Sequence, residues 1–130
     1  MRTGPSDRVE GPLLELRQSD FRGVLADGIL SSGKPYEIRF SDRSAVQDGV
    51  HLIITFPGSD ALTATDAGEA VAILVEYVTT HPLPVDCGFR VLQNFGALLN
   101  RPQPHVHAIV PGSEEERRSA PRFVDPWERS

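Results

Sequence analysis

The chain has 130 residues, a formal net charge of −5 and a single cysteine, Cys87. This length fits one domain with one hydrophobic core. The acidic balance excludes nucleic-acid binding by bulk electrostatics, and one cysteine excludes an internal disulfide. The sequence shows no secretory signal and no apolar run long enough to cross a bilayer, so we expect a cytoplasmic protein that neither binds nucleic acid nor spans a membrane.

The first half of the chain predicts a loose arm and then strands. Residues 1–12 combine charges with glycine and proline, which is typical of a loosely held arm. Leu13–Asp20 is compatible with a short helical turn, and Phe21–Leu30 with a strand and a turn. Tyr36–Phe40 alternates apolar and polar residues, as a half-buried strand does. Val50–Phe56 is apolar on both faces and is expected to lie centrally in a sheet.

The middle of the chain predicts one long helix, Asp66–Thr80. Asp66 and Glu69 fit an N-cap and N3 pair, and Pro82 requires the helix to stop before it. His81 is then expected near the last helical carbonyls. The apolar stripe recurs at three- and four-residue spacing and comprises Ala70, Ile73, Leu74, Tyr77 and Val78.

Two further strands follow, Phe89–Asn94 and His105–Val110. The order of strands around one helix predicts an α+β fold, an antiparallel sheet with one main covering helix. We expect this domain to span residues 13–112. Residues 113–130 are rich in charge and proline and are expected to form a solvated tail, with two aromatic residues that dock on the domain or on a neighbour.

The strand His105–Val110 carries a pair of histidines. In a strand, His105, His107 and Ile109 share one face. Three interpretations stay open: satisfied structural histidines, a metal site completed by His51, or an imidazole nucleophile oriented by a second ring. No carboxylate lies near enough in sequence to complete a metal site, and the nucleophile hypothesis accounts for more residues.

Four segments together resemble the histidine triad (HIT) family, in the branch of the nucleoside phosphoramidate hydrolases. His105–Val110 resembles the H-x-H-x-H-x-x signature of the family, and Arg90–Gly96 resembles its R-x-x-x-N-x-G strand. Val50–Ile54 resembles the strand that carries a further active-site histidine. Phe40–Asp42 resembles the segment with the ribose-binding aspartate, although one additional residue separates it from His51. The likeness runs from about residue 21 to residue 112.

The resemblance implies a HIT-like sheet and transfer of a nucleotidyl group to histidine, without a metal or another cofactor. By this likeness His107 is the nucleophile, and His105 and His51 orient it. Asn94 assists near the phosphate, and Asp42 holds the ribose hydroxyls. The implied partner is a nucleotide or a phosphorylated small molecule.

The chain departs from the family pattern around one expected pocket. Ile109 stands where the third histidine belongs, and Arg101 and Pro102 replace the usual glutamine and hydroxyl residue. We therefore expect altered phosphate recognition, with Arg101 supplying a charge and Ile109 contacting a specialised substrate. The alternative to a role in phosphate recognition is that Arg101 is only a solvated loop residue.

Two function classes follow. The first is a nucleotide hydrolase or transferase that acts at a phosphoryl centre through a histidine nucleophile. The second is a HIT-fold binding module, or a divergent enzyme without nucleotidyl transfer. In either case we expect a homodimer, which joins through the helix Asp66–Thr80 and the strand that begins at Phe89, because the apolar stripe with Val71 and Val75 is broader than one small sheet covers.

Overall fold

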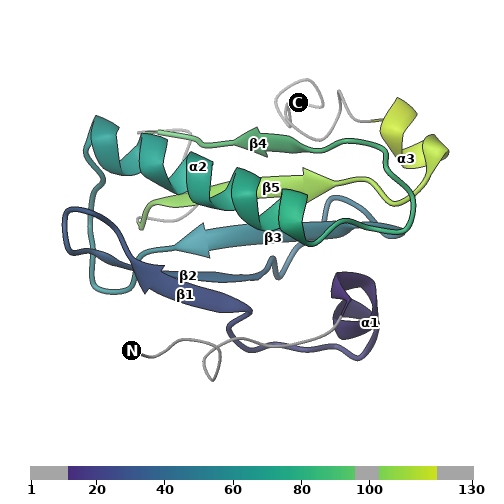
Figure 1. Cartoon of the computed structure of the whole chain (residues 1–130), viewed down its shortest axis with the longest axis horizontal. Coiled ribbons are helices and arrows are strands. Elements are labelled where there is room, and N and C mark those ends of the chain that lie inside the picture. The colour runs from purple at the N-terminus through teal and green to yellow at the C-terminus, as the bar shows by residue number, and fades with distance from the viewer. Residues whose placement is uncertain (1–11, 96–102, 120–130) are drawn as a thin grey trace.

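The computed structural model describes residues 12–95 and 103–119 (Figure 1). The expected N-terminal arm up to residue 11, the loop with Arg101 and the chain after residue 119 lie outside the described residues. The elements are α1 (Leu13–Gln18), β1 (Ala26–Ile29), β2 (Pro35–Phe40), β3 (Val50–Thr55), α2 (Ala64–Thr80), β4 (Arg90–Leu92), β5 (His105–Val110) and α3 (Glu114–Arg118).

The strands form one antiparallel sheet in the order β1-β2-β3-β5-β4. The prediction of an antiparallel α+β sheet with one main covering helix is confirmed. β3 lies at the centre of the sheet, as its doubly apolar sequence indicates. Among the described residues, no helix combines the length and the apolar character that crossing a bilayer requires.

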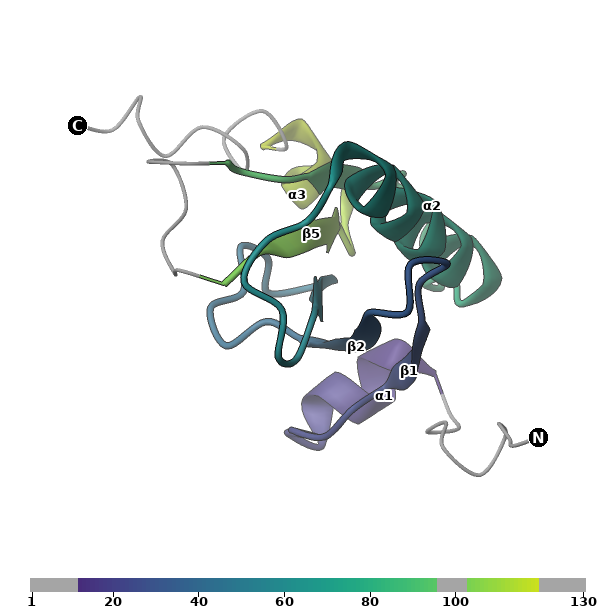
Figure 2. The ribbon, with the colours of Figure 1, turned by 90° about the vertical axis from the view of Figure 1, so that its left-hand side faces the viewer.

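The hydrophobic core lies between one face of the sheet and α2, which crosses that face (Figure 2). Because side chains alternate along a strand, every second residue of each strand points to the helix. The apolar stripe of α2 meets these residues. The fully or almost fully buried members of this interface are Ile38, Leu52, Ile54, Ala70, Leu74, Val78, Val106 and Ala108.

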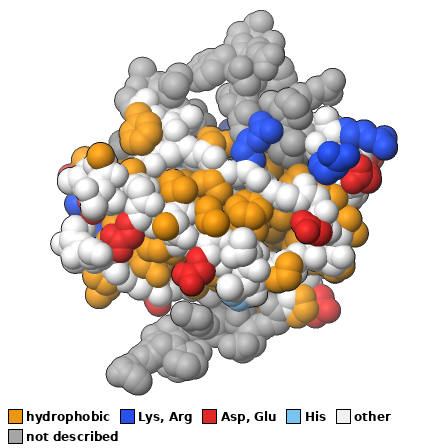
Figure 3. Space-filling model, turned by 45° about the horizontal axis from the view of Figure 1, so that its top comes forward, with side chains coloured by type: hydrophobic (Ala, Val, Ile, Leu, Met, Phe, Trp, Pro, Cys, Tyr) orange, Lys and Arg blue, Asp and Glu red, His pale blue; other side chains and the backbone are white. Residues whose placement is uncertain are grey.

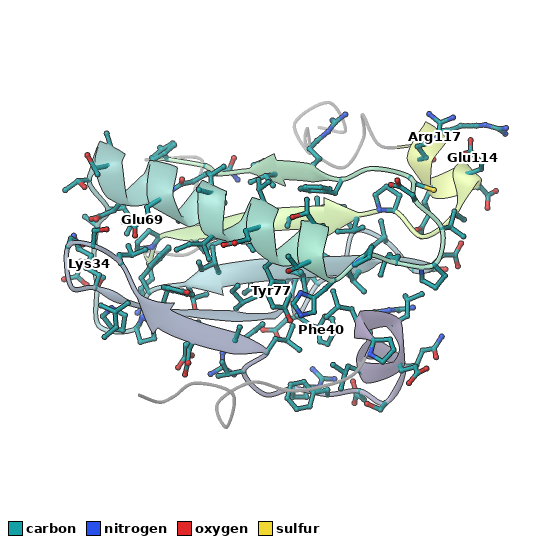
Figure 4. All side chains as sticks on the ribbon, viewed as in Figure 1. Lys34, Phe40, Glu69, Tyr77, Glu114 and Arg117 are labelled. Carbon is teal, nitrogen blue, oxygen red and sulfur yellow. The ribbon has the colours of Figure 1, made fainter. Side chains whose placement is uncertain are left out.

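α2 begins at Ala64, two residues before the predicted start at Asp66. Thr63 is the N-cap: its hydroxyl accepts the Asp66 N–H at 3.0 Å, and the Asp66 carboxylate accepts the Thr63 N–H at 3.1 Å. Asp66 also pairs with Lys34, and Glu69 accepts hydrogen bonds from the backbone N–H and the hydroxyl of Ser31. Figure 4 shows Lys34 and Glu69 at the same end of the sheet. The predicted N-cap and N3 pair is therefore wrong: Asp66 caps the helix from N3, Glu69 takes no part in the cap, and both carboxylates contact the β1–β2 turn.

The chain crosses itself closely where it enters β3 and where it leaves β5. A Cβ on Gly49 would lie 1.8 Å from the Val110 carbonyl oxygen, and a Cβ on Gly112 would lie 2.0 Å from the Asp48 carbonyl oxygen. Both positions therefore require glycine. This crossing fixes β3 and β5 relative to each other two residues before His51.

Glu116 of α3 closes the same crossing. Its carboxylate accepts the backbone N–H groups of Gln47 at 2.6 Å, Asp48 at 2.8 Å and Gly112 at 3.0 Å. Partial burial opposes the charge, but these backbone donors together lower the pKa of Glu116 below its usual value. Residues 113–119, which the sequence places in a solvated tail, are thus tied to the domain.

Candidate functional site

Three histidines lie on the face of the sheet opposite α2. His105 and His107 alternate on β5 with Val106 and Ala108, which face the core. His51 occupies the neighbouring strand β3. We call His51, His105 and His107 the histidine cluster. Ile109 shares the strand face of His105 and His107, as expected, and therefore lies beside the histidine cluster.

The rings of the histidine cluster are in contact. Nε2 of His51 lies 2.9 Å from Nδ1 of His107, which is a hydrogen-bond distance. The His105 and His107 ring centroids are 4.7 Å apart, with the rings nearly perpendicular at 81°. The sheet therefore brings together the three histidines that the sequence singles out, although His51 and His107 are 56 positions apart.

His51 is held as a neutral ring. Its Nδ1 accepts the backbone N–H of Ala45 at 3.0 Å, and only 7% of its surface is exposed. Burial lowers its pKa from 6.5 to about 4; the backbone of Arg43 opposes this shift, and the charge of His105 adds to it. The imidazole of His51 therefore stays neutral near pH 7 and contributes no charge to the histidine cluster.

This burial predicts a pH-dependent stability. As pH falls below about 6.5, the unfolded chain takes up a proton on His51 that the folded protein takes up only near pH 4. The folded state should therefore lose about 2 to 3 kcal/mol between these values because of His51. Urea unfolding measured from pH 7 to pH 4 checks this. His51→Gln should flatten the profile, whereas His81→Gln, at the end of α2, should leave it in place. An unchanged slope in His51→Gln would contradict the assignment.

A pocket of ≈ 270 Å³ adjoins the cluster at His105. Its polar lining includes Arg39, Asp42, Thr55 and Gln103, and its apolar lining includes Phe40. A second pocket of ≈ 360 Å³ shares Arg39, Phe40 and Asp42 with the first. Asp42 thus lies where two neighbouring pockets meet, within the segment that the resemblance assigns to ribose binding.

Arg39 is a pocket residue that sequence reasoning missed. Its guanidinium lies 2.8 Å from Glu37, two residues earlier on the same face of β2. In the register of the sheet, Arg39 is opposite Ile53 and Ile53 is opposite His107. The alternation of Tyr36–Phe40 contained the signal, because it places Glu37 and Arg39 together on the face away from the core. Without the strand order, that face could not be assigned to the histidines.

The remaining site candidates are placed less directly. Asn94 is half-buried and follows β4, two residues beyond Leu92, which lies opposite His107. Ile109 is buried, with 2% of its surface exposed, and lies opposite both His51 and Arg90 in the register. Arg101 lies outside the described residues.

Metal binding by the cluster finds no geometric support. Within residues 12–95 and 103–119, no three histidine, cysteine or acidic side chains are grouped so that they could hold a metal ion. In the cluster, Nε2 of His51 is directed at Nδ1 of His107 and its Nδ1 at the Ala45 N–H, so both ring nitrogens of His51 already have partners.

Comparison of the chain with family models, with curated proteins and with solved structures found no match. The functional assignment therefore depends on the chemistry of the histidine cluster, the pocket beside it and the order of the sequence motifs.

Proposed function

We propose that the protein is a HIT-like nucleotide hydrolase or transferase in which an imidazole attacks a phosphoryl centre. The observation that carries the proposal is the contact of His51, His105 and His107 beside a pocket lined by Asp42. A neutral imidazole is a nucleophile for phosphorus, and a neighbouring ring or carbonyl fixes which nitrogen carries the proton. Structural histidines alone would not require three rings in contact at the edge of a pocket.

The pocket supports a nucleotide as the bound group. Asp42 offers a carboxylate that accepts two hydroxyl donors at once, and Phe40 offers an aromatic surface nearby. Arg39 and Arg22 line the adjoining pocket, where they pair with Glu37 and Asp20 and present guanidinium N–H groups. These groups match a ribose, a base and phosphate oxygens, respectively.

Asp42→Ala should weaken the binding of adenosine monophosphate about tenfold or more, and the binding of its 2′,3′-dideoxy analogue much less. The reason is that a hydrogen bond to a charged group contributes about 1.5 to 3 kcal/mol, and the dideoxy analogue has no hydroxyl to donate. Isothermal titration calorimetry measures both affinities. Glu76→Ala removes the same charge on α2, across the sheet from the histidine cluster, and should change neither. Equal losses for both ligands would show that Asp42 does not bind the ribose.

The binding-module alternative is favoured by one observation, the buried isoleucine at the third position of the motif. Turnover separates the two functions. Adenosine phosphoramidate and diadenosine triphosphate should be hydrolysed by the wild-type protein and not by a variant with all three cluster histidines replaced. Binding of adenosine monophosphate without turnover of either compound would favour the binding module.

We also propose a homodimer through α2 and the edge strand β4. Figure 3 shows hydrophobic side chains along the middle of this side of the molecule. Val75 on α2 is 37% exposed, and Val85 and Phe95, on either side of β4 in the sequence, are 48% and 61% exposed. β4 also has no strand on its outer edge among the described residues. Light scattering at micromolar concentration should report a dimer, and Val75→Glu should shift it toward the monomer. A monomeric wild-type protein would contradict this proposal.

A further inference from the structure

The pocket of ≈ 360 Å³ continues from Asp42 away from the histidine cluster. It shares Arg39, Phe40 and Asp42 with the pocket at His105, but no histidine is among its lining residues. In a nucleotide, the ribose lies between the phosphoryl group and the base. A nucleotide with its phosphoryl group at the cluster and its ribose at Asp42 therefore directs its base into this second pocket, which we call the base pocket.

The base pocket combines aromatic rings with polar groups of both signs. Phe21 and Phe40 line it and offer apolar surface to the faces of a base. Asp20 and Arg39 line it as well, and they offer a carboxylate and a guanidinium to the edges of a base. Aromatic rings alone hold any base, because every base has a flat face. The hydrogen-bonding groups are the part of the pocket that can distinguish one base from another.

Asp20 occupies a position whose backbone favours glycine. Its φ is 63°, in the left-handed region, directly after the end of α1. The Phe21 N–H donates to the Leu16 carbonyl at 3.1 Å and the Asp20 N–H to the Arg17 carbonyl at 3.0 Å, which is the Schellman pattern of helix ends. Glycine is the usual residue at this point of the pattern. The helix end therefore gives no reason for a carboxylate here.

The Asp20 carboxylate has capacity for further donors. Among the described residues its partner is Arg22, whose Nη2 lies 3.1 Å from Oδ1 and 3.4 Å from Oδ2. The two side chains are 78% and 72% exposed, so water weakens this ion pair. A carboxylate has about four acceptor sites, and one N–H group does not fill them. Asp20 can thus accept two parallel donors from a ligand in the base pocket.

Arg39 presents two donors side by side. Its Nε and Nη2 donate to Oε1 of Glu37 at 3.2 and 2.8 Å, and its Nη1 donates to the Arg22 carbonyl at 3.4 Å. A guanidinium has five N–H bonds. One on Nη1 and one on Nη2 have no partner among the described residues, and they form a fork for two neighbouring acceptors. The ion pair with Glu37 holds this fork in place.

We infer that the base pocket selects guanine, so that the nucleotide of the proposed function is a guanine nucleotide. Guanine has two adjacent donors, N1–H and N2–H, which match the Asp20 carboxylate. It also has two adjacent acceptors, O6 and N7, which match the Arg39 fork as phosphate oxygens would. Adenine has an acceptor at N1, which a carboxylate repels, and a donor beside N7. The inference rests on the proposed function and adds the identity of the base.

Isothermal titration calorimetry with guanosine, inosine and adenosine monophosphates tests the selection on the full chain. Guanosine monophosphate should bind about tenfold or more tightly than adenosine monophosphate, a modest ratio because Asp20 is exposed to water. Inosine monophosphate lacks the N2 amino group but keeps N1–H, O6 and N7, so its affinity should lie between the other two.

Asp20→Gly removes the carboxylate without disturbing the end of α1, because glycine adopts the left-handed conformation without steric cost. The variant should bind guanosine monophosphate about tenfold more weakly and adenosine monophosphate unchanged. Asp20→Asn, which also suits this backbone, should lose the preference too, because its amide places a donor against a donor of guanine. Glu15→Gln removes the same charge from an exposed position of α1 outside the base pocket and should change neither affinity.

Arg39→Lys keeps the charge but not the planar fork. It should weaken the binding of guanosine monophosphate more than that of adenosine monophosphate. Equal affinities of the wild-type protein for the two nucleotides would overturn the inference and leave the proposed function standing. A preference for guanine that persists in Asp20→Gly would do the same. If neither nucleotide binds at millimolar concentration, the proposed function is overturned as well.

Discussion

Gly49→Ala should destabilise the protein by about 3 kcal/mol or more, enough to unfold much of a small domain at 37 °C. The added Cβ would stand 1.8 Å from the Val110 carbonyl oxygen, 2.6 Å from the Gly112 nitrogen and 2.8 Å from the Pro111 carbonyl carbon. All three are backbone atoms at the end of β5, so no side chain can rotate to make room. The two central strands would have to separate at this end of the sheet.

Gly68→Ala is the matched control for this substitution. A Cβ on Gly68 meets no atom within 4 Å, and the residue lies exposed inside α2. The same chemical change should there stabilise the protein by about 0.5 to 1 kcal/mol, because glycine costs a helix conformational entropy. Urea unfolding followed by circular dichroism measures both variants. A Gly49→Ala protein as stable as wild type would mean that the crossing of the chain is looser than described.

Ile109→His restores the third histidine of the motif, yet it should destabilise the fold by about 3 to 5 kcal/mol and leave phosphoramidate hydrolysis flat. The isoleucine is almost fully buried and lies opposite His51. Both ring nitrogens of His51 already have partners, Ala45 and His107. The new imidazole would therefore lose apolar burial and find no hydrogen bond from its cross-strand neighbour.

Two measurements check this expectation. Chemical unfolding gives the stability, with Ile109→Val as the control, which should cost only about 0.5 to 1.5 kcal/mol. Hydrolysis of adenosine phosphoramidate gives the activity at a temperature where both variants are folded. A gain of about tenfold or more from Ile109→His would show that the protein is a slow form of the ordinary phosphoramidate hydrolase and that its site accommodates an imidazole at this position.

The strands and the faces of the sheet could be predicted from the sequence because alternation has a fixed period of two. His105 and His107 were placed on one face, and the doubly apolar Val50–Phe56 was placed at the centre, as the sheet order shows. The predicted start of α2 was wrong because Thr63 and Asp66 both suit the N-terminus of a helix, and the capping box depends on which backbone N–H is unpaired.

The site was predictable in its members but not in its hydrogen bonds. The motif brought His51, His105 and His107 into one hypothesis. The partners of His51 and His105 include the Ala45 amide and the Gln103 carbonyl, which are backbone groups whose positions carry no signal in side-chain type. Glu116 belongs to the segment expected to be a solvated tail, and its contact with the domain could not be predicted for a related reason, since donors to it come from residues 47–48, far away along the chain.

The pairing of β3 with β5 has a consequence for how the chain folds during synthesis. Residues 50–55 leave the ribosome long before residues 105–110, and α2 and β4 lie between them in the sequence. The long chain segment between β3 and β5 must close into a loop before contacts between the two strands can offset the conformational entropy that this closure costs. The pairing of β3 with β5 should therefore form late. No nascent fragment that ends before β5 can contain the His51–His107 pair. Any catalytic activity of the cluster would therefore switch on only when the folding of the domain is almost complete.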